Sequence, residues 1–82
     1  MQVQVTFYGV LKQTTGVRAQ TLDLPETTRT VGDVIALLVE RHPALGPLLG
    51  SVAYVVGDDL VNSDHLLRDG DDLGLLPPVS GG

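Results

Sequence analysis

The sequence predicts a single α+β domain in which one main helix packs across one face of a mixed β-sheet. Short stretches near both ends of the chain have the two-residue hydrophobic period of strands, and a central stretch has helical spacing. The chain has 82 residues, enough for one modest core. We assign residues 1–76 to this domain and residues 77–82 to an extended C-terminal Gly-Gly tail.

The first element expected is a strand from Gln2 to Val10. Its apolar face carries Val3, Val5 and Phe7, and its polar face carries Gln2, Gln4, Thr6 and Tyr8. A second strand is expected from Ala19 to Leu24, after Gly9 and the turn-forming residues 13–16. Together they predict an antiparallel hairpin.

The main helix is expected to begin after Thr30, which serves as N-cap, with Asp33 placed to reach back to it. Its apolar stripe follows the spacing i, i+3, i+4 and i+7 and consists of Val31, Val34, Ile35 and Leu38. Pro43 disfavours helical geometry at the preceding residue, so the helix should end near His42. Residues 44–50 then predict a short turn or 3₁₀ segment.

The last third of the chain predicts strands separated by turns. Residues 52–56 form a β-branched apolar run, and residues 60–61 fit a short edge strand. In the final strand Leu73 and Leu75 share one face, Gly74 and Leu76 share the other, and the chain leaves the sheet at residue 77. This order fits a β-grasp arrangement in which the first and last strands are central neighbours.

Composition excludes several classes of function. Ten acidic and five basic residues give a net charge of −5, which opposes nucleic acids and anionic membranes and favours a basic protein partner. No apolar run has the length of a membrane span, so we expect a soluble, cytoplasmic protein without membrane association. The absence of cysteine excludes a disulfide framework and Cys-ligated zinc.

Catalysis by the chain alone is not expected. His42 and His65 are isolated, Ser80 has no local base, and no Gly-rich phosphate loop is present, so we expect no bound cofactor. Acidic residues between positions 58 and 72 lack the spacing of a calcium loop, so we expect no metal site. These acids form either a solvated, turn-rich rim or an acidic docking edge; they are Asp58, Asp59, Asp64, Asp69, Asp71 and Asp72.

The tail carries the main functional hypothesis. Two prolines stiffen its start, and two glycines give it a tip without side chains that fits a narrow channel. Its last four residues reach roughly 13 Å when extended, enough to enter a partner's active site. The tail consists of Pro77, Pro78, Val79, Ser80, Gly81 and Gly82. The alternative is an inert, frayed terminus.

Several motifs together resemble the ubiquitin-like sulfur carriers of the MoaD and ThiS type. They are Tyr8-Gly9 after a Val-x-Val strand, the helix start at residues 30–33, Asp-Gly-Asp-Asp at residues 69–72, and the Pro-Pro-Val-Ser-Gly-Gly ending. The likeness covers essentially the whole chain and is greatest to the small subunits of molybdopterin synthase. The chain departs from it at Leu75-Leu76, where members often carry an aromatic residue before the prolines.

The resemblance implies that Gly82 is adenylated by an E1-like (MoeB-like) enzyme and receives sulfur from a donor as a thiocarboxylate. The partner would use ATP and Mg²⁺, because an ionised carboxylate is a poor electrophile. A large (MoaE-like) subunit would then receive the tail in a hetero-tetramer, with Leu76 and Tyr8 as partner-binding residues. Thiamine, tRNA or cysteine synthesis as the sulfur's destination, protein modification, and an inert interaction module are the alternatives.

Overall fold

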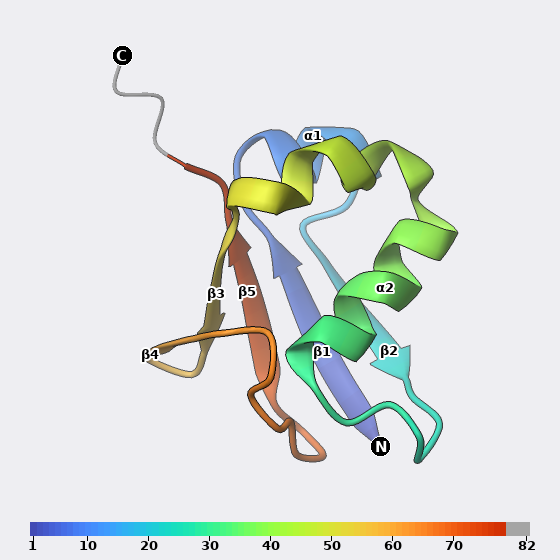
Figure 1. The fold of residues 1–82 in the computed structure, drawn as a ribbon. Coiled ribbons are helices and arrows are strands. Elements are labelled where there is room, and N and C mark those ends of the chain that lie inside the picture. Colours follow the sequence, from blue (N-terminus) through green and yellow to red (C-terminus); the bar gives the residue numbers. More distant parts are fainter. Residues whose placement is uncertain (79–82) are drawn as a thin grey trace.

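The computed structural model describes residues 1–78. Its five strands form one sheet in the order β2-β1-β5-β3-β4, in which β1 and β5 are parallel and the other neighbours are antiparallel. The main helix α2 lies across one face of this sheet (Figure 1). The elements are β1 (Gln2–Phe7), α1 (Val10–Thr15), β2 (Ala19–Asp23), α2 (Val31–Arg41), the 3₁₀ segment η1 (Pro43–Ser51), β3 (Ala53–Val56), β4 (Asp59–Val61) and β5 (Asp72–Leu76). The predicted α+β, ubiquitin-like β-grasp class is confirmed, with β1 and β5 as central neighbours.

The first strand is shorter than expected, and the helix α1 follows it. The sequence interpretation extended the strand to Val10, but β1 ends at Phe7 because Gly9 turns the chain with a φ of +57°. Leu11 then anchors α1 in the core with no exposed surface. Gly16 closes the helix in a left-handed conformation, where its amide donates to the carbonyl of Lys12 at 2.8 Å.

The main helix begins as predicted, with a complete capping box. The hydroxyl of Thr30 accepts from the amide of Asp33 at 3.1 Å, and Oδ2 of Asp33 accepts from the amides of Thr30 at 3.1 Å and Arg29 at 3.0 Å. These hydrogen bonds lower the pKa of Asp33 below its usual 3.8. The bond from the amide of Arg29 has the largest effect, and the bonds with Thr30 come next. The charged carboxylate therefore fixes the start of α2.

Aliphatic residues fill the space between the sheet and α2. Most of the predicted stripe on α2 is fully buried, although Ile35 is only half-buried, and η1 adds two leucines to the same core. The fully covered side chains are Val3, Val5, Phe7, Leu11, Leu22, Val31, Val34, Leu38, Leu45, Leu73 and Leu75. Within residues 1–78, the helices lie on this side of the sheet and leave the opposite face of β5 and β3 uncovered (Figure 1).

Three of the acidic residues near the end of the chain accept hydrogen bonds that stabilise turns and strands. Oδ1 of Asp69 accepts from the amide of Gln2 at 2.7 Å, and Oδ2 of Asp71 accepts from the amide of Arg68 at 2.8 Å. Asp72 accepts from the hydroxyl of Thr6 at 3.0 Å. Within residues 1–78, no group of three His, Cys, Asp or Glu side chains is placed to hold a metal ion.

Candidate functional site

The tail begins where β5 ends at Leu76. Pro77 is half-buried and Pro78 is exposed. Val79, Ser80, Gly81 and Gly82 lie outside the residues that the structure describes, so their predicted roles stay predictions. Because β5 runs parallel to β1, the tail leaves from the end of the sheet opposite to Met1 (Figure 1).

The two residues expected to bind a partner, Tyr8 and Leu76, line one hollow on the uncovered face of the sheet. Tyr8 is 47% exposed and Leu76 is 36% exposed. The hollow has a volume of about 100 Å³, and its lining is completed by Val55, Gly57, Asp72 and Gly74. The structure thus brings together residues that are far apart in the sequence, at the point where the tail begins.

An apolar row extends this hollow toward the edge of the sheet. Leu60 in β4 pairs with Val55 in β3, which pairs in turn with Gly74 in β5. Directly paired residues point to the same face of a sheet, so these three positions form one row. Leu60 is 74% exposed, the highest value among the large hydrophobic residues of the described chain. Together with the hollow, Leu60 makes this face a candidate protein-binding surface.

Acidic side chains border the apolar row. Asp58 and Asp59 are exposed at the turn between β3 and β4, and Asp72 lies beside the hollow. The hydrogen bond from Thr6 keeps the carboxylate of Asp72 at this border. The surface therefore has an apolar centre with a negatively charged rim, which complements a partner that carries basic residues around an apolar patch.

Sequence reasoning missed Gly9, Val55 and Gly74 as neighbours of the tail. A Cβ added at Gly74 would lie 3.3 Å from Cε2 of the Tyr8 ring, so the ring covers this glycine. A Cβ added at Gly9 would lie 3.0 Å from Cγ of Pro77. The alternation of Gly74 and Leu76 on one face was a usable signal, whereas the contact with residues 8 and 9 depends on the parallel pairing of β1 and β5.

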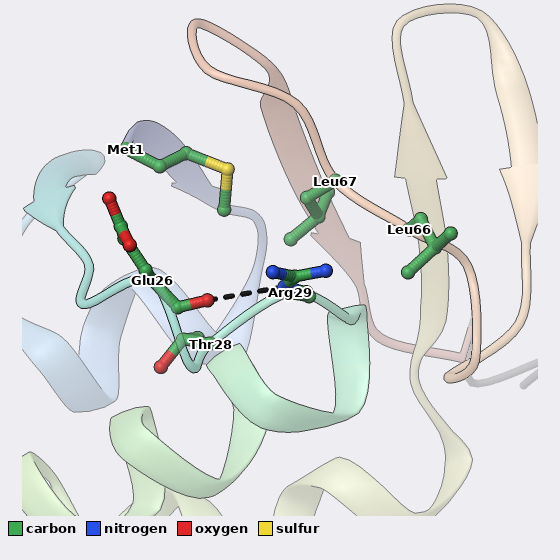
Figure 2. A pocket seen from close by; sticks show the side chains of 6 residues that line it. All are labelled: Met1, Glu26, Thr28, Arg29, Leu66 and Leu67. Atoms are coloured by element: carbon green, nitrogen blue, oxygen red, sulfur yellow. Dashed lines mark hydrogen bonds between the residues drawn. The ribbon is translucent and has the colours of Figure 1, made fainter.

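A larger hollow of about 510 Å³ lies at the other end of the sheet, where the chain starts. Figure 2 shows Met1, Leu66 and Leu67 around it, together with Arg29, whose Nε donates to the carbonyl of Glu26 at 3.2 Å. None of the predicted site residues lines it. We therefore place the candidate site at the smaller hollow, because only that one adjoins the tail.

Both histidines lie at helix ends or in backbone hydrogen bonds, away from the candidate site. His42 caps the end of α2, and its Nε2 lies 3.4 Å from Oε1 of Gln20. The carbonyl of His65 accepts from the amide of Val31 at 3.0 Å. None of the helices in residues 1–78 has the length and apolar character needed to span a bilayer.

A β-grasp domain with a hollow at the start of its C-terminal tail is typical of the ubiquitin-like carrier proteins. The chain belongs to the ThiS family, whose model matches residues 5–82.

Individual relatives agree with this family. The molybdopterin synthase sulfur carrier subunit of Chlamydomonas reinhardtii is 30% identical, and the match covers 100% of both chains. The crystal structure of SAMP1 from Haloferax volcanii superimposes with a TM-score of 0.86 at 28% identity over 100% of both chains. A protein–protein complex of subunits 1 and 2 of the molybdopterin-converting factor from Helicobacter pylori contains a chain that matches with a TM-score of 0.72 at 30% identity, also over 100% of both chains.

Proposed function

We propose that this chain is the sulfur carrier subunit of a molybdopterin synthase and that Gly82 carries the sulfur as a thiocarboxylate. The observation that supports this most directly is the place of the apolar hollow, where β5 passes into the tail at Leu76 and Pro77. A partner that covers the hollow also receives the tail. The name of the Chlamydomonas relative, which matches over its full length, favours molybdopterin synthesis as the pathway.

The proposed chemistry starts with activation of the terminal carboxylate. Its oxygen attacks the α-phosphate of ATP in the activating partner, forms an acyl-adenylate and releases pyrophosphate. A hydrosulfide equivalent from the sulfur donor then attacks the acyl carbon, and the C–O bond to AMP breaks as the C–S bond forms. Activation is needed because the α-carboxyl group, with a pKa of about 3.3–3.7 in model compounds, is ionised at neutral pH. ATP and Mg²⁺ belong to the partner, and the reaction belongs in the cytoplasm.

The large synthase subunit is proposed to cover the uncovered sheet face. Leu76 and Tyr8 would lie at the centre of this interface and Leu60 near its edge, with basic partner residues opposite the acidic rim. The Helicobacter complex of two converting-factor subunits supports a partner of this kind. Two copies of each subunit in a hetero-tetramer are the proposed assembly.

The test is the intact mass of the chain after incubation with an E1-like activator, ATP and a sulfur donor. The expected result is one oxygen exchanged for sulfur, with the change located at Gly82 by fragmentation. Omission of ATP is the control and should abolish the change. If a competent cognate activator leaves the mass unchanged, the carrier hypothesis is wrong and the inert interaction module takes its place.

Protein modification is a second candidate, favoured by the full-length likeness to SAMP1, since a relative from the same organism is named small archaeal modifier protein 1. The same activated Gly82 would then form an isopeptide bond with lysine amines. Expression in native cells separates the two functions: conjugates with a Gly-Gly remnant on lysines indicate modification, whereas co-purification of a large synthase subunit indicates sulfur transfer. Delivery of sulfur to thiamine, tRNA or cysteine synthesis would be revealed by a different co-purifying enzyme.

A further inference from the structure

Tyr8 and Gly9, which connect β1 to α1, contact the end of β5 and the residue that follows it. The ring of Tyr8 covers Gly74, and the amide of Tyr8 donates to the carbonyl of Leu75 at 3.4 Å. Gly9 then lies against the ring of Pro77. These successive contacts extend the parallel pairing of β1 and β5 beyond the strands, up to the first residue of the tail.

Position 9 favours glycine for two separate reasons. Its φ of +57° and ψ of −130° belong to a region that residues with a Cβ avoid. The Cβ of any L-residue would also lie 3.0 Å from Cγ of Pro77, a tight contact that requires the proline ring to shift by a few tenths of an ångström. The second reason concerns the tail and not the fold, because within 4 Å of this Cβ position the contacts are with Pro77 alone.

The position of the Pro77 ring against Gly9 influences the direction in which the chain leaves the sheet. The ring contains N and Cα of Pro77, so its position sets the direction of the Cα–C bond, and the following proline restricts ψ of Pro77 to extended values. A ring held against Gly9 therefore points the exit of the chain in one direction. A tail that is already directed loses less conformational freedom when a partner takes it up.

We infer that Gly9 is a positioning residue: it seats Pro77 and so directs the tail into the partner's active site. This inference rests on the proposed sulfur-carrier function. It adds that the rate of activation and transfer depends on a residue in the first third of the chain, far in sequence from Gly82.

The tail supplies a matched pair of variants. Pro77→Ala and Pro78→Ala each remove one proline ring, yet only Pro77 contacts Gly9. NMR nuclear Overhauser effects between the α protons of Gly9 and the ring protons of Pro77 should be present in the wild type and retained in Pro78→Ala. In single-turnover thiocarboxylate formation at saturating activator, Pro77→Ala should be slower than Pro78→Ala by roughly tenfold, since small misplacements cost that much or more.

Gly9→Ala tests the other side of the contact. It should slow the same step roughly tenfold in the wild-type background and have little further effect in Pro77→Ala, because no ring remains to be displaced. Gly70→Ala is the control for backbone strain: Gly70 has a φ of +87°, and nothing lies within 4 Å of its Cβ position. Its amide donates to the carbonyl of Gln2 at 2.7 Å, so it lies at the start of β1, away from Pro77. It should lower the Tm without changing the rate.

The outcomes separate the inference from the function on which it rests. Equal rates for Pro77→Ala and Pro78→Ala, or an equal effect of Gly9→Ala in both backgrounds, would overturn the positioning role while wild-type activity upholds the carrier. A wild type that forms no thiocarboxylate would overturn both. If Gly9→Ala does not fold, the pair of proline variants still decides, because both keep Gly9.

Discussion

The two faces of β5 differ sharply in burial. On one face Leu73 and Leu75 are fully buried in the core. On the other face Leu76 is 36% exposed, and Gly74 is covered by a single tyrosine ring. The alternation of side chains along this five-residue strand thus separates the core from the proposed partner-binding face. Substitutions one residue apart should therefore have entirely different consequences.

The largest expected effect is on the buried face. Leu75→Ala removes a fully buried side chain and should lower the free energy of unfolding by about 2–5 kcal/mol, measured by urea denaturation. A small domain has about 5–15 kcal/mol in total, so this loss is a large part of it. Leu76→Ala is the control and should cost much less. A similar loss for both variants would remove the distinction between the two faces.

The next effect is on the uncovered face. Leu76→Asp should leave the Tm nearly unchanged but weaken binding of the large synthase subunit by roughly tenfold or more, because it puts an unpaired carboxylate at the centre of an apolar contact. Isothermal titration calorimetry with the purified subunit measures this.

Leu66→Asp is the matched control for that experiment, since Leu66 is 64% exposed but belongs to the hollow at the other end of the sheet. The affinity of the Leu66→Asp variant for the large synthase subunit should equal that of the wild type. If Leu76→Asp unfolds the protein, Leu76 belongs to the core; if both aspartates weaken binding equally, the interface lies elsewhere.

The fold was largely readable from the sequence because its signals are local. The alternation of Val3, Val5 and Phe7 and the capping box of Thr30 and Asp33 each depend on residues a few positions apart. The six-residue helix α1 was missed because it is too short to show a helical period, and its Gly9 and Gly16 were read as turn residues.

The site was only partly readable. Tyr8 and Leu76 were expected to bind a partner, and the structure places both in one hollow. The seat of Pro77 on Gly9 was not foreseen, since it joins residues 68 positions apart through the register of two parallel strands. A pairing register of this kind is set by the packing of the whole sheet and not by neighbouring residues.

The smallest effect is expected for a substitution at Asp33, which lies at the start of α2 and on neither face of β5. The pKa of Asp33 is lowered in the folded chain, so its carboxylate stabilises the fold above the ordinary value of 3.8 and loses this effect as the pH falls through the lower folded value. Asp33→Asn should lower the Tm slightly at pH 7, and the difference from the wild type should shrink below about pH 4.

Glu40→Gln, at an exposed position of the same helix, is the control for that pH series and should follow the wild type. A difference between the Asp33→Asn and wild-type melting temperatures that stays constant from pH 7 to pH 3 would mean that charge plays no part in the cap.

The proposed division between a folded domain and a reactive tail can be tested by changing the tail alone. Gly81→Val should keep the wild-type Tm, because terminal residues contribute little to folding, but it should block transfer, since a β-branched side chain fills a channel sized for backbone. A variant with normal transfer would show that the partner's channel admits side chains. Full-length wild type, melted and assayed in parallel, is the reference.

Deletion of Gly82 tests the account most directly. It shortens the tail by about 3.3–3.6 Å, when reacting atoms must approach to roughly 3–3.5 Å. Single-turnover thiocarboxylate formation and sulfur transfer should fall to background while the melting curve remains that of the wild type. Full activity in the folded, shortened chain would contradict the proposal that the chemistry resides at Gly82.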